Sequence, residues 1–292
     1  MRDFVYNTLK LISPLFSRFY INRLRVLAYH DIVDEANFEA QIIWLKLKYN
    51  IIDIPTLKDH LFHDKQLPAN SLLITLDDGD KTVYTKGLPI FKRHQISSCL
   101  FIITDLINTN KDFWWNTIIK NEKKNGFSQV KIMEVINKFK SMPNNQRIRS
   151  LDKYPATYQD QLTIDEVKEL EKNRVFNGNH SHTHPMFDKL ELKELKEELE
   201  QARTFFLKND IGDFRVFAYP NGNFSEGTEQ LLTENQIEIA FLFDHQINQK
   251  KINPLRISRI AVDSDNSLSE FKTKVSGLHP IIRKIQKQFS CR

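Results

Sequence analysis

The sequence predicts one barrel-like α/β domain, and three observations support that prediction. From about residue 25 onward, short apolar runs alternate with amphipathic stretches. Consecutive runs are separated by enough chain for a parallel strand–helix–strand unit. The composition shows no break and no internal repeat that would divide the chain. With 292 residues, 40% of them hydrophobic, the chain can bury a core of this size.

The first elements show the alternation of strands and helices most clearly. Residues 25–30 (RVLAYH) predict a buried strand, and residues 35–48 predict a helix. Residues 71–79 (SLLITLDDG) predict a strand that runs into a turn. Residues 81–94 have apolar side chains at helical spacing, and residues 97–104 (SSCLFIIT) predict the next strand. Together they indicate a βαβ unit.

The middle of the chain is less regular. Residues 108–160 lack a clear strand–helix alternation and are expected to form an insertion at one end of the sheet, with a helix over 129–140. Thr163 and Glu166 have the spacing of a capping box that opens a helix over 163–173.

The alternation then resumes. A long charged helix is expected over about 190–208, followed by a strand and loop over 214–222 (FRVFAYPNG). A helix near 226–235 leads to an apolar strand at 237–243. Residues 256–262 (RISRIAV) predict one more strand.

The ends of the chain are expected to lie outside this domain. Residues 1–24 have apolar residues at roughly helical spacing among basic ones, but Lys10 and Pro14 interrupt them and no small-residue cleavage site follows. That argues against a signal peptide or a spanning helix. The segment suits an anionic membrane surface, and packing on the main domain is an equal alternative. We expect an amphipathic segment at 1–24, the main domain at 25–275 and a tail at 276–292.

Charge and cysteine content narrow the function classes. The formal net charge is only +5, and lysines alternate with glutamates over 189–200, which is typical of a solvated helix and not of a nucleic-acid surface. Cys99 and Cys291 are the two cysteines, so a disulfide framework is excluded. We expect a cytoplasmic protein, peripheral at the inner face of the membrane if residues 1–24 bind lipid.

Two adjacent carboxylates end the apolar strand at 71–79. Asp77 and Asp78 precede Gly79, and a turn there could bring both side chains into one cleft. The ends of strands are where α/β barrels hold catalytic groups. Two acids so close resist joint ionisation unless a cation or hydrogen bonds intervene. The alternative is an ordinary Asp-Gly turn.

Three histidines cluster in residues 179–185 (NHSHTHP). His180 and His184 suit two ligands on one helical turn, and all three, with His182, suit one strand face. A polar loop before Pro185 is the alternative. Combined with the aspartates, the cluster favours a metal site of one carboxylate and two imidazoles. Such a set serves zinc-type hydrolysis or non-haem iron oxygenation. A second, free aspartate favours hydrolysis.

Four motifs in this order and spacing, LAYHDI, TLDDG, NHSHTH and FAYPNG, resemble the polysaccharide deacetylase (NodB-homology) family, carbohydrate esterase family four. The resemblance covers roughly residues 25–275. It implies a distorted (β/α) barrel with the insertion around 108–160. It also implies a divalent metal, expected to be Zn²⁺ with Co²⁺, Ni²⁺ or Fe²⁺ as alternatives. The implied reaction removes N-acetyl or O-acetyl groups from a polysaccharide or sugar precursor.

The resemblance also assigns residues. Asp77 would be the base that activates the metal-bound water, and Asp78, His180 and His184 would hold the metal. His182 falls at a variable position and is expected either to lie behind the metal ligands or to face solvent. The motif FAYPNG, with Tyr219 and Pro220, would form one wall of the groove, and the backbone N–H of Tyr219 would help to hold the oxyanion.

The sequence departs from the family at the residue that orients the base. Many members have an arginine just before the Tyr-Pro pair, where this chain has Ala218. Arg259 is our candidate for the missing cation, and Arg215 is a weaker one.

The general acid is the second departure. The family often uses a late histidine after a leucine, which makes His279 the candidate, with His30 and His245 as further ones. Trp114 and Trp115 could form a sugar-stacking platform, or they could pack the insertion onto the barrel.

These assignments predict a metal-dependent hydrolase that deacetylates a glycan or sugar precursor. One alternative is a deformylase or deacetylase of a lipid-linked sugar, which the basic, apolar N-terminus would suit. Another is a low-activity glycan-binding relative that lacks the general acid. An Fe(II) oxygenase is the most distant alternative.

Overall fold

The protein folds around one curved sheet of parallel strands. The computed structural model describes residues 2–278, apart from the side chains of 2–5, 7, 8, 10–12 and 226. The strands are β1 (Arg25–Tyr29), β2 (Asn50–Ile51), β3 (Ser71–Leu76), β4 (Ser98–Ile102), β5 (Val175–Asn179), β6 (Asp213–Ala218), β7 (Ile239–Phe241) and β8 (Ile260–Ala261). Their spatial order is β7-β6-β5-β4-β3-β1-β8, with β2 beside β3. Every pairing is parallel.

The sheet curls until its two edges meet through an irregular segment. Ile257, just before β8, bridges Phe241 of β7, while β8 pairs with β1. The predicted distorted (β/α) barrel is therefore confirmed.

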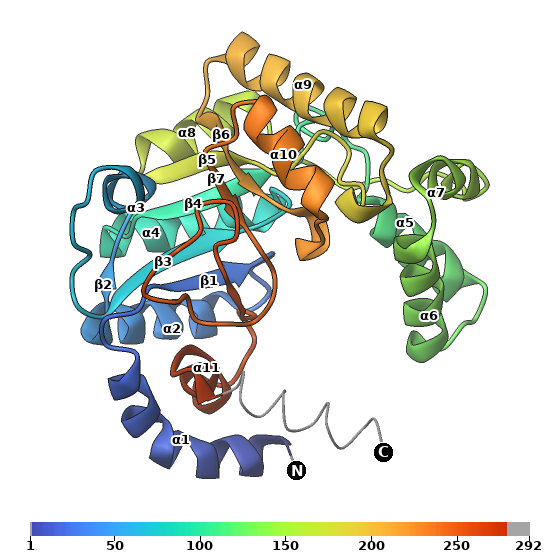
Figure 1. Cartoon of the computed structure of the whole chain (residues 1–292). Coiled ribbons are helices and arrows are strands. Elements are labelled where there is room, and N and C mark those ends of the chain that lie inside the picture. The colour runs from blue at the N-terminus through green and yellow to red at the C-terminus, as the bar shows by residue number, and fades with distance from the viewer. Residues whose placement is uncertain (1, 279–292) are drawn as a thin grey trace.

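Helices surround the sheet, and most of them cover the outside of the barrel (Figure 1). They are α1 (Arg2–Phe19), α2 (Glu35–Lys48), α3 (Ile54–Phe62), α4 (Leu88–His94), α5 (Trp114–Lys124), α6 (Gln129–Ser141), α7 (Asn144–Leu151), α8 (Ile164–Lys172), α9 (Leu192–Asn209), α10 (Glu226–Glu234) and α11 (Leu268–Val275). Short helical turns are η1 (Val83–Gly87), η2 (Phe187–Lys189) and η3 (Pro220–Gly222). Helices α5, α6 and α7 form the predicted insertion, which projects at the right of Figure 1.

Strand periodicity divides the core into an inner and an outer part. On β3, Leu73 belongs to the cluster inside the barrel, whereas Ile74 belongs to the larger cluster between the sheet and its helices. Ile54 and Leu57 of α3 join the inner cluster. Because side chains alternate along a strand, the inner series continues from Leu73 to Asp77, which thus points into the barrel.

Most predicted elements are confirmed to within a few residues, including the capping box of Thr163 and Glu166 at the start of α8. The predicted helix over 81–94 is instead divided into the π-helical turn η1 and α4. The elements that were not predicted are helices α3, α5, α7 and α11 and strands β2 and β5. Strand β5 (VFNGN) is polar but buried, because the Asn177 and Asn179 amides donate to backbone carbonyls. Those bonds offset part of the cost of burial, and the polar residues leave no apolar pattern in the sequence.

One buried arginine helps to hold helix α1 on the main body. The Arg25 guanidinium, on β1, donates to the carbonyls of Ser17, Tyr20 and Val275. It thereby joins the last turns of α1 and α11, whose carbonyls carry partial negative charge. Among residues 2–278, no helix combines the length and apolar character needed to cross a bilayer.

Candidate metal centre and active site

The two aspartates share one turn at the carboxyl end of β3. The Asp77 N–H donates to the Tyr29 carbonyl, which continues the ladder with β1. The Gly79 N–H then donates back to the Asp77 carbonyl, at 2.9 Å, across a three-residue turn. Asp78, the central residue, has a φ of 69°, and Gly79 has a φ of 77°. This rarely populated backbone turns Asp78 so that both aspartates line one cavity.

Asp77 is held by Arg259 in a buried, bidentate ion pair. Arg259 Nη1 and Nη2 donate to the two carboxylate oxygens of Asp77 at 2.6 and 2.8 Å. The same guanidinium donates to the Leu242 carbonyl and the Thr75 hydroxyl, which fixes its plane. Burial alone would raise the pKa of Asp77, but the charge and hydrogen bonds of Arg259, together with the nearby His180, outweigh it, so that the pKa is lowered.

The weaker arginine candidate lies elsewhere. Arg215 pairs with Asp213 and Glu238 near the amino ends of β6 and β7. Its side chain is 42% exposed. Of the two candidates, only Arg259 touches Asp77.

Asp78 and two histidines form a cluster suited to a metal ion. Asp78 Oδ1 lies 3.4 Å from His180 Nε2 and 3.5 Å from His184 Nε2. The candidate ligand atoms all lie within 4.8 Å of one another, and the three residues are buried. His180 Nδ1 lies 2.9 Å from the Ala218 carbonyl, so that it carries the hydrogen and leaves the Nε2 lone pair facing the cluster.

Two buried polar atoms of this cluster have no hydrogen-bond partner. They are Asp78 Oδ1 and His184 Nδ1. A buried carboxylate oxygen without a donor is costly, and a cation at this point would remove the cost. One carboxylate and two imidazoles are a donor set that Zn²⁺ and similar divalent ions accept. The residues therefore fit a metal.

The histidines lie on a loop after β5, and neither a helical turn nor a strand holds them. Ser181 and His184 have left-handed φ values of 68° and 56°. The Ser181 N–H donates to Asn179 Oδ1 and the His184 N–H donates to Ser181 Oγ, which closes the loop. His182 turns away, and its Nδ1 lies 2.9 Å from the Thr104 hydroxyl.

The two clustered histidines differ in their pKa. Burial lowers the pKa of His184 to about 3, which keeps it neutral and able to donate a lone pair. Burial also opposes the charge of His180, but the neighbouring carboxylates of Asp77 and Asp78 outweigh it and raise its pKa. Burial would raise the pKa of Asp78, but His180, His184 and His30 together outweigh it, so that this pKa is lowered.

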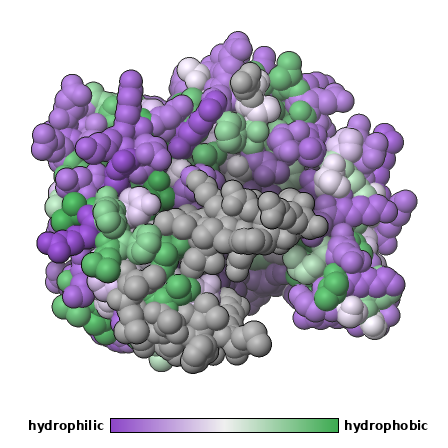
Figure 2. All heavy atoms as spheres, turned by 60° about the horizontal axis from the view of Figure 1, so that its bottom comes forward, coloured by the Kyte–Doolittle hydropathy of each residue, from purple (hydrophilic) through white to green (hydrophobic). Residues whose placement is uncertain are grey.

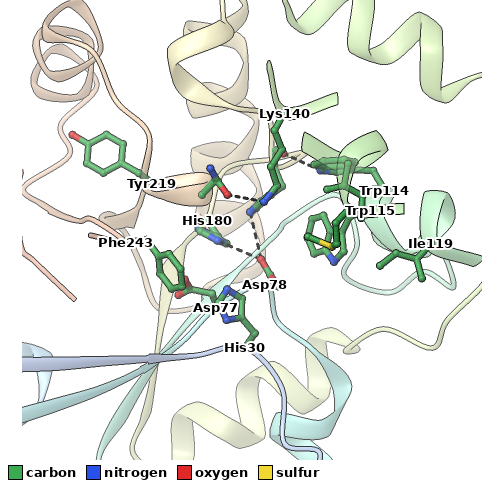
Figure 3. A pocket seen from close by; sticks show the side chains of 14 residues that line it. His30, Asp77, Asp78, Trp114, Trp115, Ile119, Lys140, His180, Tyr219 and Phe243 are labelled. Carbon is green, nitrogen blue, oxygen red and sulfur yellow. Dashed lines mark hydrogen bonds and ion pairs between the residues drawn. The ribbon is translucent and has the colours of Figure 1, made fainter. Parts of the chain in front are cut away.

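A cavity of about 260 Å³ opens above these groups (Figure 3). Its polar floor comes from the ends of the strands and its other side from the insertion. The lining residues are His30, Asp77, Asp78, Trp114, Trp115, Ile119, Met133, Ile136, Lys140, His180, His184, Tyr219, Asn221 and Phe243.

Trp114 and Trp115 join the insertion to the metal cluster. Trp114 Nε1 donates to the His184 carbonyl, and the Arg147 guanidinium lies over the Trp114 ring. The Trp115 ring lies 4.9 Å from the His184 ring and stacks on Phe113. Both tryptophans thus line the cavity and also pack the insertion onto the barrel.

The structure corrects the expectation for the Tyr219 backbone. Its N–H donates to the Phe241 carbonyl at 3.0 Å as part of the β6–β7 ladder, so it is not free to hold an oxyanion. The Tyr219 hydroxyl donates to the Leu255 carbonyl. Pro220 is buried and does not line the cavity, whereas Asn221 of the same motif does.

The three histidines that are candidates for the general acid lie at different distances from the cavity or outside the described residues. His30 lines the cavity, with its ring 5.4 Å from that of Phe243. His245 contacts Phe243 from outside the cavity lining. His279 lies outside the described residues.

Sequence reasoning missed the polar contact between Lys140 and Asn221 in the cavity. Lys140 of α6 donates to Asn221 Oδ1 at 2.7 Å. The FAYPNG motif pointed to Asn221, but no sequence pattern linked it to a lysine 81 residues away.

The barrel brings two adjacent aspartates and two histidines together at one end of its strands. This is the arrangement that the four sequence motifs imply. The chain belongs to the polysaccharide deacetylase family, whose sequence model matches residues 64–240, more than half of the chain. That match contains both aspartates and the histidine loop, and it ends before Arg259.

Individual relatives and solved structures agree with this family assignment. The chain is 23% identical over 259 residues to the poly-β-1,6-N-acetyl-D-glucosamine N-deacetylase of Staphylococcus aureus, covering 85% of this chain and 73% of the relative. The Staphylococcus epidermidis enzyme is 23% identical over 235 residues, covering 80% and 68%. Among solved structures, IcaB from Ammonifex degensii has a TM-score of 0.64 at 16% identity, covering 87% of this chain and 96% of that one. The deacetylase PplD of Streptococcus pyogenes also gives 0.64, at 15% identity, covering 87% and 98%.

Proposed function

We propose that this protein is a metal-dependent hydrolase that removes N-acetyl groups from a glycan. The observation that carries the proposal is the buried cluster of Asp78, His180 and His184 beside a second aspartate held by an arginine. The relatives named for deacetylation of poly-β-1,6-N-acetyl-D-glucosamine support that class of substrate. An O-acetylated glycan or an acetylated sugar precursor would use the same groups.

Asp78, His180 and His184 would hold the metal through Oδ1 and the two Nε2 atoms. Zn²⁺ is the first candidate, with Co²⁺, Ni²⁺ or Fe²⁺ as alternatives. When bound, the ion would supply Lewis acidity toward the acetyl carbonyl and toward water.

Asp77 is the proposed base. Arg259 keeps its carboxylate ionised and fixes its plane, so that a remaining lone pair can take a proton from the attacking water. Arg259 thus acts through Asp77 and orients the base. In many family members this is the role of the arginine whose position Ala218 occupies here. Tyr219 cannot supply the proposed oxyanion N–H while that group stays in the ladder.

The tryptophans and the apolar side chains of the insertion give the cavity a wall against which a sugar ring could lie. An indole face binds the apolar face of a pyranose through dispersion and C–H contacts. Trp114 and Trp115 are the proposed platform for this contact.

The test uses β-1,6-linked N-acetylglucosamine oligomers and metal analysis of the purified protein. Asp77→Asn should retain the metal and lose turnover, whereas His184→Ala should lose both. Full activity of Asp77→Asn would disprove the proposed base.

A mass-spectrometric panel of formylated and lipid-linked sugars separates the deacetylase from the alternative deformylase. A wild type that binds glycans without hydrolysing any member of the panel would favour the glycan-binding alternative.

A second proposal concerns the membrane. Leu15 and Phe19 of α1 are 61% and 80% exposed, and the basic Arg18 lies between them in sequence. Figure 2 views this side of the molecule and shows hydrophobic side chains among hydrophilic ones. We propose that α1 lies on an anionic membrane surface, at the inner face for a cytoplasmic protein. Co-sedimentation with anionic vesicles should be lost in a Leu15→Ser, Phe19→Ser variant, and binding to zwitterionic vesicles of equal strength would contradict the charge argument.

A further inference from the structure

The insertion presents one face of α6 to the cavity. Met133, Ile136 and Lys140 line the cavity and are spaced three and four residues apart, which places them on one side of a helix. Lys138 of the same helix is exposed to solvent. The insertion thus brings a single ammonium group to the groups described above, as Figure 3 shows.

Lys140 is a half-buried cation without an acidic partner. Its Nζ donates to Asn221 Oδ1 at 2.7 Å, and within the described part of the chain no carboxylate lies within ion-pair distance of it. Asn221 is itself held in a left-handed conformation, with a φ of 57°, in the turn η3. The contact uses one of the three ammonium hydrogens, which leaves two for a bound substrate. Holding a half-buried cation without a carboxylate partner costs free energy. This cost suggests that Lys140 has a function in the cavity.

The proposed reaction needs a proton donor that the metal ligands and the base do not supply. An amine leaves an amide readily only when its nitrogen receives a proton as the carbon–nitrogen bond breaks. His180 and His184 are assigned to the metal, and Asp77 is held ionised by Arg259. His30 lies on the side of Asp77, to whose lowered pKa its charge contributes. The charge of Asp78 reaches Lys140, and Figure 3 shows Lys140 on the side of Asp78 away from His30.

We propose that Lys140 is the proton donor to the leaving amine, a role that rests on the proposed deacetylase function. As the carbon–nitrogen bond breaks, its electron pair stays on nitrogen, which takes a proton from Nζ. Lys140 is left as a neutral amine and regains a proton from solvent, while Asp77 releases the proton it took from water. The products are the free amino sugar and acetate.

Burial agrees with this role, because it lowers the pKa of Lys140 and makes its ammonium a better acid than a solvated lysine.

The test compares two leaving groups. Acetylated β-1,6-glucosamine oligomers need a proton on the departing nitrogen, whereas 4-nitrophenyl acetate releases a stable phenolate without one. For Lys140→Met and Lys140→Arg we expect kcat/KM on the oligomer to fall by about 100-fold or more, and the value on the ester to change by less than about 3-fold. Arginine keeps the charge but does not give up its proton near neutral pH, so Lys140→Arg separates proton transfer from charge. Lys138→Met is the matched control and should resemble the wild type on both substrates.

Lys140→Arg with wild-type activity on the oligomer would overturn the assignment. An equal loss on both substrates, with the melting temperature unchanged, would also overturn it and indicate a general role in the cavity. A wild type that hydrolyses neither substrate would refute the proposed deacetylase function, and the role of Lys140 with it.

Discussion

The buried pair of Asp77 and Arg259 permits a quantitative test of how the base is held. Arg259 has no exposed side-chain surface and Asp77 is 3% exposed, so removal of the arginine leaves a carboxylate that water does not reach. Losing one partner of such a pair costs about 3–5 kcal/mol of the free energy of unfolding. The two charge-assisted hydrogen bonds, at 2.6 and 2.8 Å, give a similar figure at about 1.5–3 kcal/mol each.

We therefore expect Arg259→Leu to lower the unfolding free energy at pH 7 by about 3–5 kcal/mol, measured by urea unfolding followed by circular dichroism. Adding Asp77→Asn should restore part of this loss, because the stranded charge is then gone. Arg215→Leu is the matched control. Its ion pairs lie at the surface and are partly exposed, so they should contribute no more than about 1 kcal/mol.

The reasoning would be refuted if Arg259→Leu cost no more than Arg215→Leu. It would equally be refuted if the double variant were less stable than Arg259→Leu alone, since the loss would then come from packing and not from an unpaired carboxylate.

Three further predictions concern the metal, the barrel and the pH dependence. Chelation should lower the melting temperature of the metal-loaded wild type, and His184→Ala should show no such shift, because a ligand that binds only the folded state stabilises it. Gly178→Ala should destabilise the fold by about 1–3 kcal/mol in chemical unfolding, since a Cβ there would lie 2.7 Å from the Phe101 ring. Burial would raise the pKa of Asp213, but the hydrogen bond from Arg215 helps to lower it, so this carboxylate stabilises the fold above its unfolded pKa of about 3.9. That stability should be lost as the pH falls through the folded value, and Asp213→Asn should remove this part of the acid sensitivity of the melting temperature.

Sequence periodicity was sufficient for most of the fold. Buried strands such as 71–79 and 97–104 are continuous apolar runs, because parallel strands are covered on both faces. Strand β5 was not predicted, because its burial depends on hydrogen bonds from the Asn177 and Asn179 amides to backbone carbonyls of other elements. That compensation exists only after the chain has folded.

The sequence by itself determined which residues carry the candidate chemistry, since Asp77, Asp78, His180 and His184 lie in short motifs whose spacing is local. Tertiary structure alone decided what surrounds them. Arg259 reaches Asp77 because the segment before β8 closes the barrel, and Lys140 reaches the cavity because the insertion packs over the end of the sheet. The tertiary structure also places the Tyr219 N–H in the hydrogen-bond ladder between β6 and β7. Contacts between segments so far apart in the chain depend on barrel closure and packing, which no local pattern of residues encodes.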